Sequence, residues 1–397
     1  MQKFLRLVVF TALLAAPTVF AQRKIGEVSI NVDKHQIPVH VSGSTPELDA
    51  LARTAFGAHG RYRLVASGGE FDIRFSAVSG TQVRVDITKG LGTATFASET
   101  ATGTNLHHAL FRAADIAVEK TNGLGLRGFF TAKLAFIGEG TGKKEIYASD
   151  LFFSPGSVRR VTSDNALALS PRWSPDGGKV IYTSFYKSGF PDIFQIDLAS
   201  GQRTTFVSFR GTNSSARFSP NGSQVAMVLS GEGTPEIYVS NAQGRQVTRR
   251  TRSDAVKSSP CFSPDGGRIV FAMEPGPQLY VMAAGGGSPQ RLSVGFSYAA
   301  EPDWSRTNPN KIACTVRVGK QYQIAVYDLT KGSAEVVSKA DFDAIEPSWL
   351  ADGRHLIYTA RDRSSSVLCI LDTETGQSKR LAPANLGATL EASVWTP

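Results

Sequence analysis

Cysteine is scarce in this sequence. The chain of 397 residues contains three, Cys261, Cys314 and Cys369, and each lies within or beside an apolar run. Three thiols exclude a framework of several disulfides, and we expect them to be small buried hydrophobic side chains. The sequence leaves open whether any two of them pair.

Histidine is also scarce, with six residues, and it is almost missing from the second part of the chain. His355 alone follows residue 128, and the five that precede it are His35, His40, His59, His107 and His108. Adjacent residues of a helix point about 100° apart, so His107 and His108 cannot face one ligand together. This distribution argues against a histidine-based metal site. Because His355 lies beside a turn, we expect it to be a surface or cross-strand residue.

Long hydrophobic runs are missing except at the start of the chain. Lys3 and Arg6 precede an apolar run over residues 7–15, and a small-residue stretch ends at Ala21. This order is typical of a secretory signal peptide, and the run is shorter than the roughly 20 residues that a spanning helix needs. We expect residues 1–21 to be cleaved, and the mature protein to lie outside the cytoplasm without a membrane span.

Common catalytic and phosphate-binding motifs are missing as well. The sequence contains no Gly-x-Ser-x-Gly nucleophile elbow, and no Gly-rich run has the strand and helix context of a phosphate loop. The formal net charge of +9 is spread along the chain instead of gathering in a tail. Such a spread favours a solvated basic surface over a nucleic-acid site, and export points the same way.

Residues 22–128 have a mixed α/β pattern. Ser44 or Thr45 is placed to cap one helix, Thr104 or Asn105 to cap another, and Gly123 to end the second. Alternating apolar residues predict the strands between them. The expected strands cover residues 28–32, 38–41, 71–78, 82–88 and 93–98, and the expected helices cover 44–56 and about 105–122.

A seven-residue motif organises the remainder of the chain. Residues 171–177 read Pro-Arg-Trp-Ser-Pro-Asp-Gly, and imperfect copies return at intervals of 42 to 46 residues. An aromatic residue that ends one strand, a Pro-Asp-Gly turn and an alternating apolar run are typical of a β-hairpin. The aromatic anchors are Trp173, Phe218, Phe262, Trp304, Trp349 and Trp395.

Each repeat also contains a second aromatic-rich strand and, after a Gly-containing turn, a fourth strand. About 44 residues and four strands per repeat correspond to one blade of a β-propeller. Residues 133–137 match a blade that has no anchor of its own, and we expect residues 393–395 to supply its missing strand. The sequence therefore predicts a mainly β protein, with a small α/β domain over residues 22–128 and a six-bladed propeller of WD40-like repeats over residues 129–397.

Polar residues precede the anchors at a fixed distance. The residue three positions before each of the first five anchors is Ser or Glu, and Glu391 lies four before Trp395. The segment that enters the innermost strand of a blade surrounds the mouth of the central channel, so we expect these side chains to converge there. This polar ring consists of Ser170, Ser215, Ser259, Glu301, Glu346 and Glu391.

Two interpretations of the polar ring remain open. In the first, the side chains satisfy neighbouring backbone groups or face solvent. In the second, the hydroxyls on one half and the carboxylates on the other form a docking surface for a cationic loop, or an oxygen cluster suited to calcium. No other cofactor is expected.

The junction between the two predicted domains carries a resemblance to a known family. Residues 108–123 run into residues 127–136, Trp-Ser-Pro-Asp-Gly blades follow, and the sequence ends Val394-Trp395-Thr396-Pro397. Together with the signal peptide and the blade count, these segments resemble the TolB family, the periplasmic propeller proteins of the Tol-Pal cell-envelope system. The resemblance covers nearly the whole mature chain.

The resemblance implies a non-enzymatic, monomeric periplasmic scaffold that supports outer-membrane integrity and cell division. Its propeller would bind the peptidoglycan-associated lipoprotein Pal through two loops at the channel mouth, and a segment near residues 22–32 would bind TolA. The loop residues are Thr212, Asn213, Ser214, Ser215, Lys257, Ser258 and Ser259. The residues of the N-terminal segment are Glu27, Val28, Ile30 and Val32.

Two alternatives remain open beside this reading. A TolB-like protein could serve another envelope complex, with the same fold and other partners. The second alternative is a secreted propeller enzyme that cleaves polysaccharide as a lyase or a glycosidase. Such an enzyme needs a histidine-rich metal cluster or a pair of acids in the channel, and the scarcity of histidine in the blades argues against the metal cluster.

Overall fold

The computed structural model describes residues 36–90, 92, 94–382 and 384–397. The predicted signal peptide lies outside the described residues. So do the predicted strand at 28–32 and the four residues of the predicted TolA-binding segment, Glu27, Val28, Ile30 and Val32.

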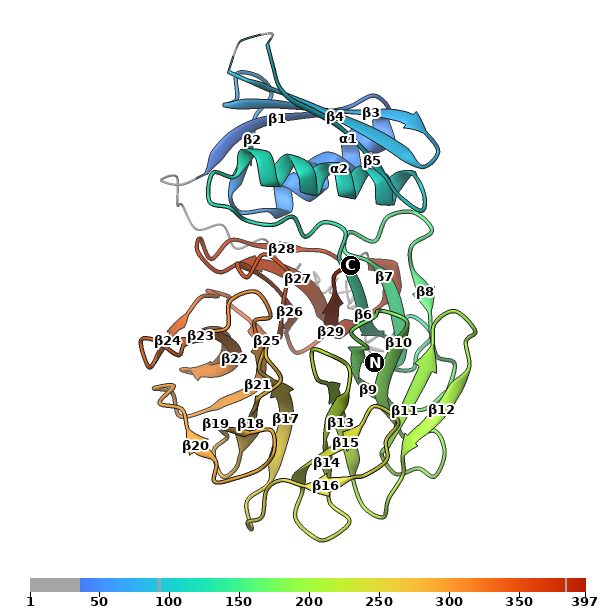
Figure 1. Cartoon of the computed structure of the whole chain (residues 1–397), viewed down its shortest axis with the longest axis vertical. Helices are drawn as coiled ribbons and strands as arrows, with labels where there is room; N and C mark the ends of the chain where they lie inside the picture. Colours follow the sequence, from blue (N-terminus) through green and yellow to red (C-terminus); the bar gives the residue numbers. More distant parts are fainter. Residues whose placement is uncertain (1–35, 91, 93, 383) are drawn as a thin grey trace, which may run out of the picture.

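An α/β layer forms the N-terminal part of the described chain (Figure 1). Two helices, α1 (Pro46–Ala58) and α2 (Leu106–Thr121), cover one face of a five-stranded sheet. In spatial order the strands are β2 (Tyr62–Leu64), β1 (Ile37–Gly43), β3 (Phe71–Ser79), β4 (Gln82–Lys89) and β5 (Thr95–Thr102). The pairs of β1 with β2 and β3 are parallel, and the pairs of β4 with β3 and β5 are antiparallel.

Side-chain caps fix where both helices begin. The Thr45 hydroxyl accepts a hydrogen bond from the Leu48 amide over 3.3 Å, and the Asn105 side chain accepts one from the His108 amide over 2.8 Å. Each cap satisfies an N–H group that has no partner inside the helix. The predicted helices are thus confirmed, although α1 runs two residues further than expected, to Ala58.

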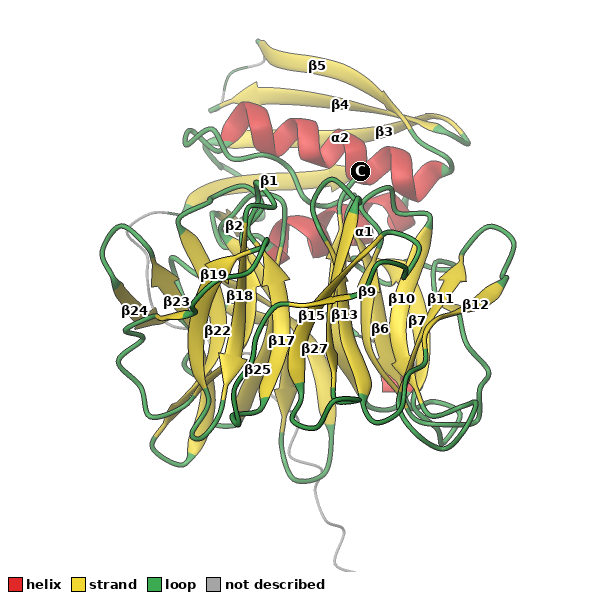
Figure 2. Ribbon diagram, turned by 60° about the horizontal axis from the view of Figure 1, so that its bottom comes forward, coloured by secondary structure: helices red, strands yellow, loops and turns green. Residues whose placement is uncertain are grey.

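Six four-stranded antiparallel sheets surround a central axis in the described part of the chain (Figures 1 and 2). The innermost strands are β9 (Ala168–Trp173), β13 (Asn213–Phe218), β17 (Lys257–Phe262), β21 (Ala299–Trp304), β25 (Asp343–Trp349) and β29 (Thr389–Trp395). The second strands are β10 (Lys179–Ser184), β14 (Gln224–Leu229), β18 (Arg268–Met273), β22 (Lys311–Val318), β26 (His355–Arg361) and β6 (Lys133–Gly138).

The two outer rows of strands complete the blades. The third strands are β7 (Glu145–Asp150), β11 (Asp192–Asp197), β15 (Glu236–Asn241), β19 (Gln278–Ala283), β23 (Gln321–Asp328) and β27 (Ser366–Asp372). The outermost strands are β8 (Arg159–Arg160), β12 (Arg203–Val207), β16 (Thr248–Arg249), β20 (Gln290–Arg291), β24 (Ser333–Val336) and β28 (Ser378–Arg380). A single 3-10 turn, η1 (Ala384–Leu386), precedes β29.

The ring closes through β29, which pairs antiparallel with β6. In this pairing Val394 lies opposite Leu134, as Trp173 lies opposite Val180 in the next blade. Val394 therefore occupies the position of the sixth anchor, and the prediction that assigned it to Trp395 is wrong by one residue. The correction places Glu391 three residues before its anchor, like the other members of the polar ring.

The hairpin turn of the repeat has the expected geometry. The Ser174 amide donates to the Lys179 carbonyl and the Gly177 amide to the Ser174 carbonyl, both over 2.9 Å. Gly177 has a φ of 70°, which glycine adopts without a steric penalty, and Asp176 accepts a hydrogen bond from the Gly178 amide.

One hydrophobic core joins the α/β layer to the propeller. Phe56 of α1 packs on Phe130, with ring centroids 5.5 Å apart, and Phe130 packs on Phe152 beside the first blade. His355 of β26 is fully buried where the layer meets the propeller. Of the two predicted alternatives, a surface or a cross-strand position, the structure shows the cross-strand one, opposite Asp372.

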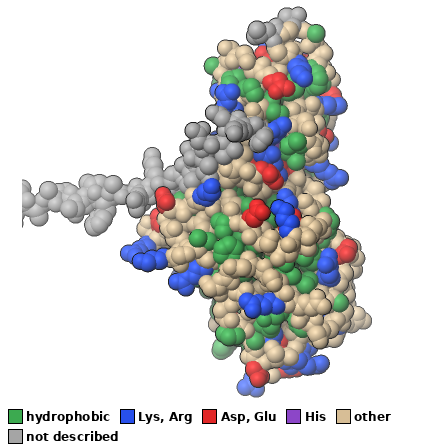
Figure 3. Space-filling view, turned by 90° about the vertical axis from the view of Figure 1, so that its left-hand side faces the viewer, with side chains coloured by type: hydrophobic (Ala, Val, Ile, Leu, Met, Phe, Trp, Pro, Cys, Tyr) green, Lys and Arg blue, Asp and Glu red, His purple; other side chains and the backbone are tan. Residues whose placement is uncertain are grey.

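The three cysteines are buried, as their apolar surroundings predict, and all three are free thiols in the structure. On the face that Figure 3 shows, Lys and Arg side chains are spread among Asp and Glu side chains instead of gathering in one patch.

Among the described residues, neither helix is long and apolar enough to cross a bilayer.

Candidate docking site at the propeller channel

The structure brings all six members of the polar ring to one cavity. The cavity has a volume of about 140 Å³, and its other lining residues include Arg172 and Arg217. The innermost strands end at the hairpin turns that approach the α/β layer, and they begin at the opposite face of the propeller (Figure 2). The loops before these strands therefore lie at the mouth remote from the α/β layer.

A β-bulge positions each member of the ring. All six residues have a positive φ, between 51° and 58°, and the register of each innermost strand shifts at this point. A residue with a side chain is strained in this region, at a cost of order 1–3 kcal/mol. Nine described residues other than glycine have a positive φ, so the ring accounts for most of them. Because such strain persists only where surrounding contacts impose it, these six residues are held in one arrangement around the channel.

The glutamates of the ring connect neighbouring blades. Glu301 Oε2 accepts hydrogen bonds from the Thr315 hydroxyl, over 2.6 Å, and from the Glu346 amide, over 3.1 Å. Glu346 Oε2 likewise accepts from the Thr359 hydroxyl, over 2.7 Å, and from the Glu391 amide, over 3.1 Å. Each carboxylate thus satisfies the backbone amide of the next bulge.

The chain of contacts continues into the serine half. Glu391 Oε2 accepts a hydrogen bond from the Ser170 amide over 2.5 Å, and the Thr183 hydroxyl accepts one from the Ser215 amide over 3.3 Å. These contacts support the first interpretation of the ring, in which its polar groups satisfy neighbouring backbone. They also leave the bulges pre-organised, which a docking surface requires. The suitability of these oxygens for calcium stays a prediction.

Burial changes the acid–base behaviour of the ring. Burial, and then the charges of Glu391 and Glu301, raise the pKa of Glu346 from 4.5 to about 8. Burial also raises the pKa of Glu391, whereas it lowers the pKa of Arg172. The carboxylates therefore do not all carry a charge at neutral pH, and two arginines face the same cavity.

Two of the predicted loop residues are buried. Asn213 is fully buried, and its side-chain amide donates to the Phe209 carbonyl over 2.7 Å and accepts from the Phe209 amide over 3.0 Å. Lys257 is 1% exposed, and its Nζ lies 2.8 Å from Glu236 Oε2. In this conformation these two side chains shape the loops, and the part of the loops in binding a partner stays a prediction.

The other predicted loop residues are half-buried, so part of each remains accessible to a partner. They are Thr212, Ser214, Ser215, Ser258 and Ser259.

The sequence interpretation missed the partners of the ring. Thr183, Thr315 and Thr359 occupy the same register on the second strands of three blades. An alignment of the repeats would show a threonine at this position in three of the six blades. It could not show that the hydroxyl reaches the bulge, because the bulge is not visible in the sequence. Arg172 and Arg217 also line the cavity. Each follows a ring serine by two residues, and the sequence pattern that identifies the ring does not include this position.

The fold and the site define a class of protein. It is a six-bladed β-propeller closed by its C-terminal strand, with a polar channel ringed by bulges and an α/β layer on the opposite face. The family described as the TolB beta propeller domain matches residues 121–397. This match covers more than half of the chain, which therefore belongs to the TolB family.

Curated relatives carry the same family name. The chain is 40% identical over 129 residues to a Tol-Pal system protein TolB from Desulfosudis oleivorans, a match that covers 32% of this chain and 28% of that protein. It is 33% identical over 165 residues to a TolB homologue from Chlorobium luteolum, covering 41% and 37%. The chain thus spans about a third of the length of the relatives it matches.

Solved structures show the same fold. TolB from Acinetobacter baumannii superposes with a TM-score of 0.78 at 23% identity, covering 90% of this chain and 96% of that one. A putative TolB from Agrobacterium tumefaciens superposes with a TM-score of 0.51 at 18% identity, covering 67% and 99%. The predicted fold and the resemblance to the TolB family are confirmed.

Proposed function

We propose that this protein is a non-enzymatic periplasmic scaffold of the Tol-Pal system. In this proposal the channel mouth binds Pal, and the segment around residues 22–32 binds TolA after removal of residues 1–21. The scaffold consists of an α/β domain over residues 22–128 and a propeller over residues 129–397. Through these two contacts it supports outer-membrane integrity and cell division.

The pre-organised polar ring carries the proposal. A partner loop that enters the mouth meets hydroxyls and carboxylates whose backbone is already fixed by strained bulges and by contacts between blades. A surface that does not need to order itself on binding keeps more of the interaction free energy. The carboxylate of Glu301 favours a partner loop with a positive charge.

Family membership supports the choice of partners. The relative from Desulfosudis oleivorans is named as a Tol-Pal system protein. The match covers 28% of that protein and 37% of the Chlorobium luteolum relative, so the partners of the whole relatives do not transfer directly to this chain. The assignment of Pal and TolA to this chain therefore rests on the resemblance together with the geometry of the mouth.

Isothermal titration of the mature protein with the soluble domain of Pal tests the first contact. The variant Glu301→Gln keeps the hydrogen-bond acceptor and removes a carboxylate charge from the ring, so we expect at least about tenfold weaker binding. The matched control is Glu335→Gln, which removes one exposed carboxylate. Equal affinity of the ring variant and the control would contradict docking of a cationic loop at the mouth.

Deletion of residues 22–32 tests the second contact. We expect the deletion to abolish binding of TolA and to leave binding of Pal at the channel mouth measurable. Unchanged binding of TolA after the deletion would contradict the assignment of the N-terminal segment.

An assay with a panel of acidic and neutral oligosaccharides tests the alternative class. A scaffold leaves these substrates intact. Cleavage that the double variant Glu301→Gln/Glu346→Gln abolishes would replace the scaffold with a propeller enzyme that uses acids of the channel.

A further inference from the structure

Exposed hydrophobic side chains gather on the loops of one blade. Nine large hydrophobic side chains are exposed among the described residues, and Phe190, at 69%, is the most exposed of them. Phe209 is 53% exposed, Tyr186 49% and Leu167 39%. We call these four residues the aromatic patch. Single exposed apolar side chains are ordinary on protein surfaces, whereas several of them on neighbouring loops mark an interaction surface.

The three loops that carry the aromatic patch lie at the same face of the propeller as the polar ring. Leu167 directly precedes β9, and β9 begins opposite the end of β10. The loop from β10 to β11, with Tyr186 and Phe190, therefore lies at this face, and so does the loop before β13, with Phe209. Ser170 of the polar ring follows Leu167 by three residues. The aromatic patch thus adjoins the channel mouth.

Hydrogen bonds hold the three loops against one another. The Phe185 amide donates to the Leu167 carbonyl over 3.1 Å, which joins the first loop to the second. The Asn213 side-chain amide donates to the carbonyls of Phe209, over 2.7 Å, and Pro191, over 3.2 Å. One amide group therefore joins the second loop to the third. Because Asn213 belongs to the loop that is predicted to bind Pal, the aromatic patch and that loop form one continuous surface.

Tyr186 is fixed by contacts within its own blade. The guanidinium carbon of Arg203 lies 4.0 Å from the centroid of the Tyr186 ring, and the Phe194 ring lies 6.3 Å away. Arg203 in turn pairs with the buried carboxylate of Asp164. A side chain that is already ordered loses little conformational entropy when a partner packs on it. The loop of Tyr186 and Phe190 is therefore prepared for binding.

Two cations flank the aromatic patch. Lys187 follows Tyr186 and Arg210 follows Phe209; both are exposed, and neither forms an ion pair within the part of the chain that the structure describes. The carboxylate of Glu301 belongs to another blade of the ring, that of β21. The mouth therefore has an apolar side with positive charge and a separate side with a carboxylate. On the apolar side, charge complementarity favours a partner segment with an acidic side chain.

We propose that the aromatic patch binds an apolar segment with an acidic side chain, on the same partner whose cationic loop enters the channel mouth. The inference rests on the proposed docking of Pal and adds a second contact to it. Apolar side chains of the partner cover Phe190 and Phe209, and the acidic group pairs with Lys187 or Arg210 at the rim of the contact. Two contacts of opposite charge then fix the orientation of the partner on the propeller.

Isothermal titration with the soluble domain of Pal tests the proposal. We expect Phe190→Ser/Phe209→Ser to bind Pal at least about tenfold more weakly, because it removes the two most exposed rings of the aromatic patch. The matched control is Phe96→Ser/Leu124→Ser, which removes two hydrophobic side chains exposed outside the propeller. Equal affinity of the patch variant and the control would overturn this inference alone. No binding of Pal by the unmodified protein would overturn the proposed docking as well.

The variant Arg210→Glu tests the charge of the partner segment. We expect at least about tenfold weaker binding of Pal at low ionic strength, and a smaller difference as salt is added. The control is Arg245→Glu, at an exposed position in the turn between β15 and β16, which should bind Pal like the unmodified protein. Unchanged or tighter binding by Arg210→Glu would overturn the assignment of an acidic segment.

Hydrogen exchange of the unmodified protein decides the question if the patch variant does not fold. With Pal bound, amides of residues 185–190 and 208–212 should exchange more slowly, and unchanged exchange there would overturn the proposal. Vesicles of phosphatidylglycerol test a lipid surface as the other occupant. Vesicle binding that Phe190→Ser/Phe209→Ser abolishes, together with unchanged affinity of this variant for Pal, would assign the aromatic patch to lipid and overturn the proposal.

Discussion

Trp395 packs on Trp173, with ring centroids 6.1 Å apart, and its indole N–H donates to the Pro175 carbonyl over 3.0 Å. Lys133 Nζ lies 5.4 Å from the centroid of the Trp395 ring. Trp395 belongs to the innermost strand of one blade, whereas Trp173 and Pro175 belong to the next blade. The end of β29 therefore closes its own blade and fixes the neighbouring hairpin turn at the same time.

Removal of residues 388–397 should lower stability far more than removal of a surface tail. The deletion exposes the edge of β6, removes the contact between Trp395 and Trp173, and leaves the Ser170 amide without Glu391. An exposed strand edge also promotes aggregation. Thermal unfolding followed by circular dichroism measures the effect. We expect the shortened protein to show no cooperative transition near the melting temperature of the full chain.

The control for this deletion removes only the last residue, Pro397, which is exposed. Its melting temperature should match that of the full chain. A protein without residues 388–397 that melts at the same temperature as the control would contradict closure through β29.

Gly177→Ala should destabilise the hairpin turn for two reasons. Gly177 has a φ of 70°, and a Cβ at this position would lie 2.4 Å from an atom of the Trp395 ring. The positive φ costs about 1–2 kcal/mol for alanine, and the overlap adds about 1–3 kcal/mol because Trp395 is held by its own contacts. Urea denaturation measures the sum.

Gly142→Ala is the matched control for the overlap. Gly142 has a φ of 76° in the turn between β6 and β7, and a Cβ there meets nothing within 4 Å. This variant should lose only the conformational part of the free energy. Equal losses in the two variants would show that Trp395 does not constrain the turn.

The sequence predicts the blades well because every repeat contains the same local pattern. A strand, a Pro-Asp-Gly turn and a second strand are determined by neighbouring residues, and the caps at Thr45 and Asn105 are local as well. The three-residue strand β2 is too short to show alternation, so the sequence does not predict it. Trp395 fits the aromatic position of the motif, but its pairing with Lys133 shows that Val394 occupies that register.

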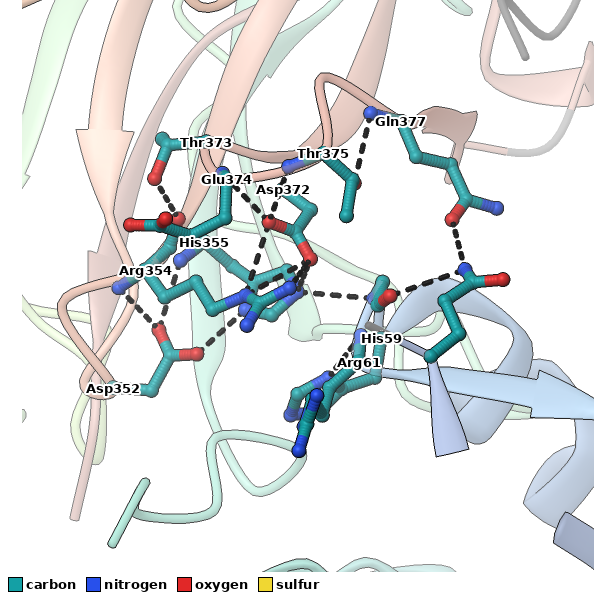
Figure 4. A network of polar contacts seen from close by, with 12 residues as sticks. His59, Arg61, Asp352, Arg354, His355, Asp372, Thr373, Glu374, Thr375 and Gln377 are labelled. Carbon is teal, nitrogen blue, oxygen red and sulfur yellow. Dashed lines mark hydrogen bonds and ion pairs between the residues drawn. The ribbon is translucent and has the colours of Figure 1, made fainter. Parts of the chain in front are cut away.

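The site was predictable in position and not in detail. Counting back from the anchors identifies the six residues of the polar ring, because each blade repeats the same strand. The bulges with positive φ cannot be read from Ser or Glu, which rarely adopt this conformation. His355 is buried by contacts with His59 (Figure 4) and Phe129, which are distant in the sequence, so no local pattern predicts its burial.

Glu346→Gln should stabilise the protein at alkaline pH. Glu346 has a pKa of about 8 in the folded protein, against 4.5 for an ordinary glutamate, mainly because of burial. The folded protein therefore keeps a proton that the unfolded chain releases, and its stability falls as pH rises from about 4.5 to about 8. Glutamine cannot ionise, so the variant should gain on the order of 1 kcal/mol above about pH 8.

Urea denaturation across this pH range measures the difference between the variant and the unmodified protein. The difference should be near zero at the acidic end and grow with pH. Glu335→Gln, at an exposed position of β24, is the control and should show no such trend. A difference that stays constant with pH would mean that Glu346 ionises in the folded protein as it does in the unfolded chain.

Gly60→Ala should weaken the contact between the α/β layer and the propeller. A Cβ on Gly60 would lie 2.0 Å from Asp372 Oδ2 and 2.6 Å from Asp372 Cβ. Asp372 cannot move aside easily, because it is bound by Arg354 and faces His355. We expect a loss of about 1–3 kcal/mol in the free energy of unfolding, as for an overpacked core.

Small-angle scattering distinguishes weakening of this contact from general destabilisation. If the α/β layer separates from the propeller, the radius of gyration of Gly60→Ala increases under conditions where the propeller remains folded. Gly80→Ala is the control, because Gly80 is exposed in the turn between β3 and β4 and a Cβ there meets nothing within 4 Å. An unchanged radius and an unchanged free energy in Gly60→Ala would mean that the loop after α1 can retreat from Asp372 without cost, and that the two parts are held together by the Phe56 and Phe130 packing alone.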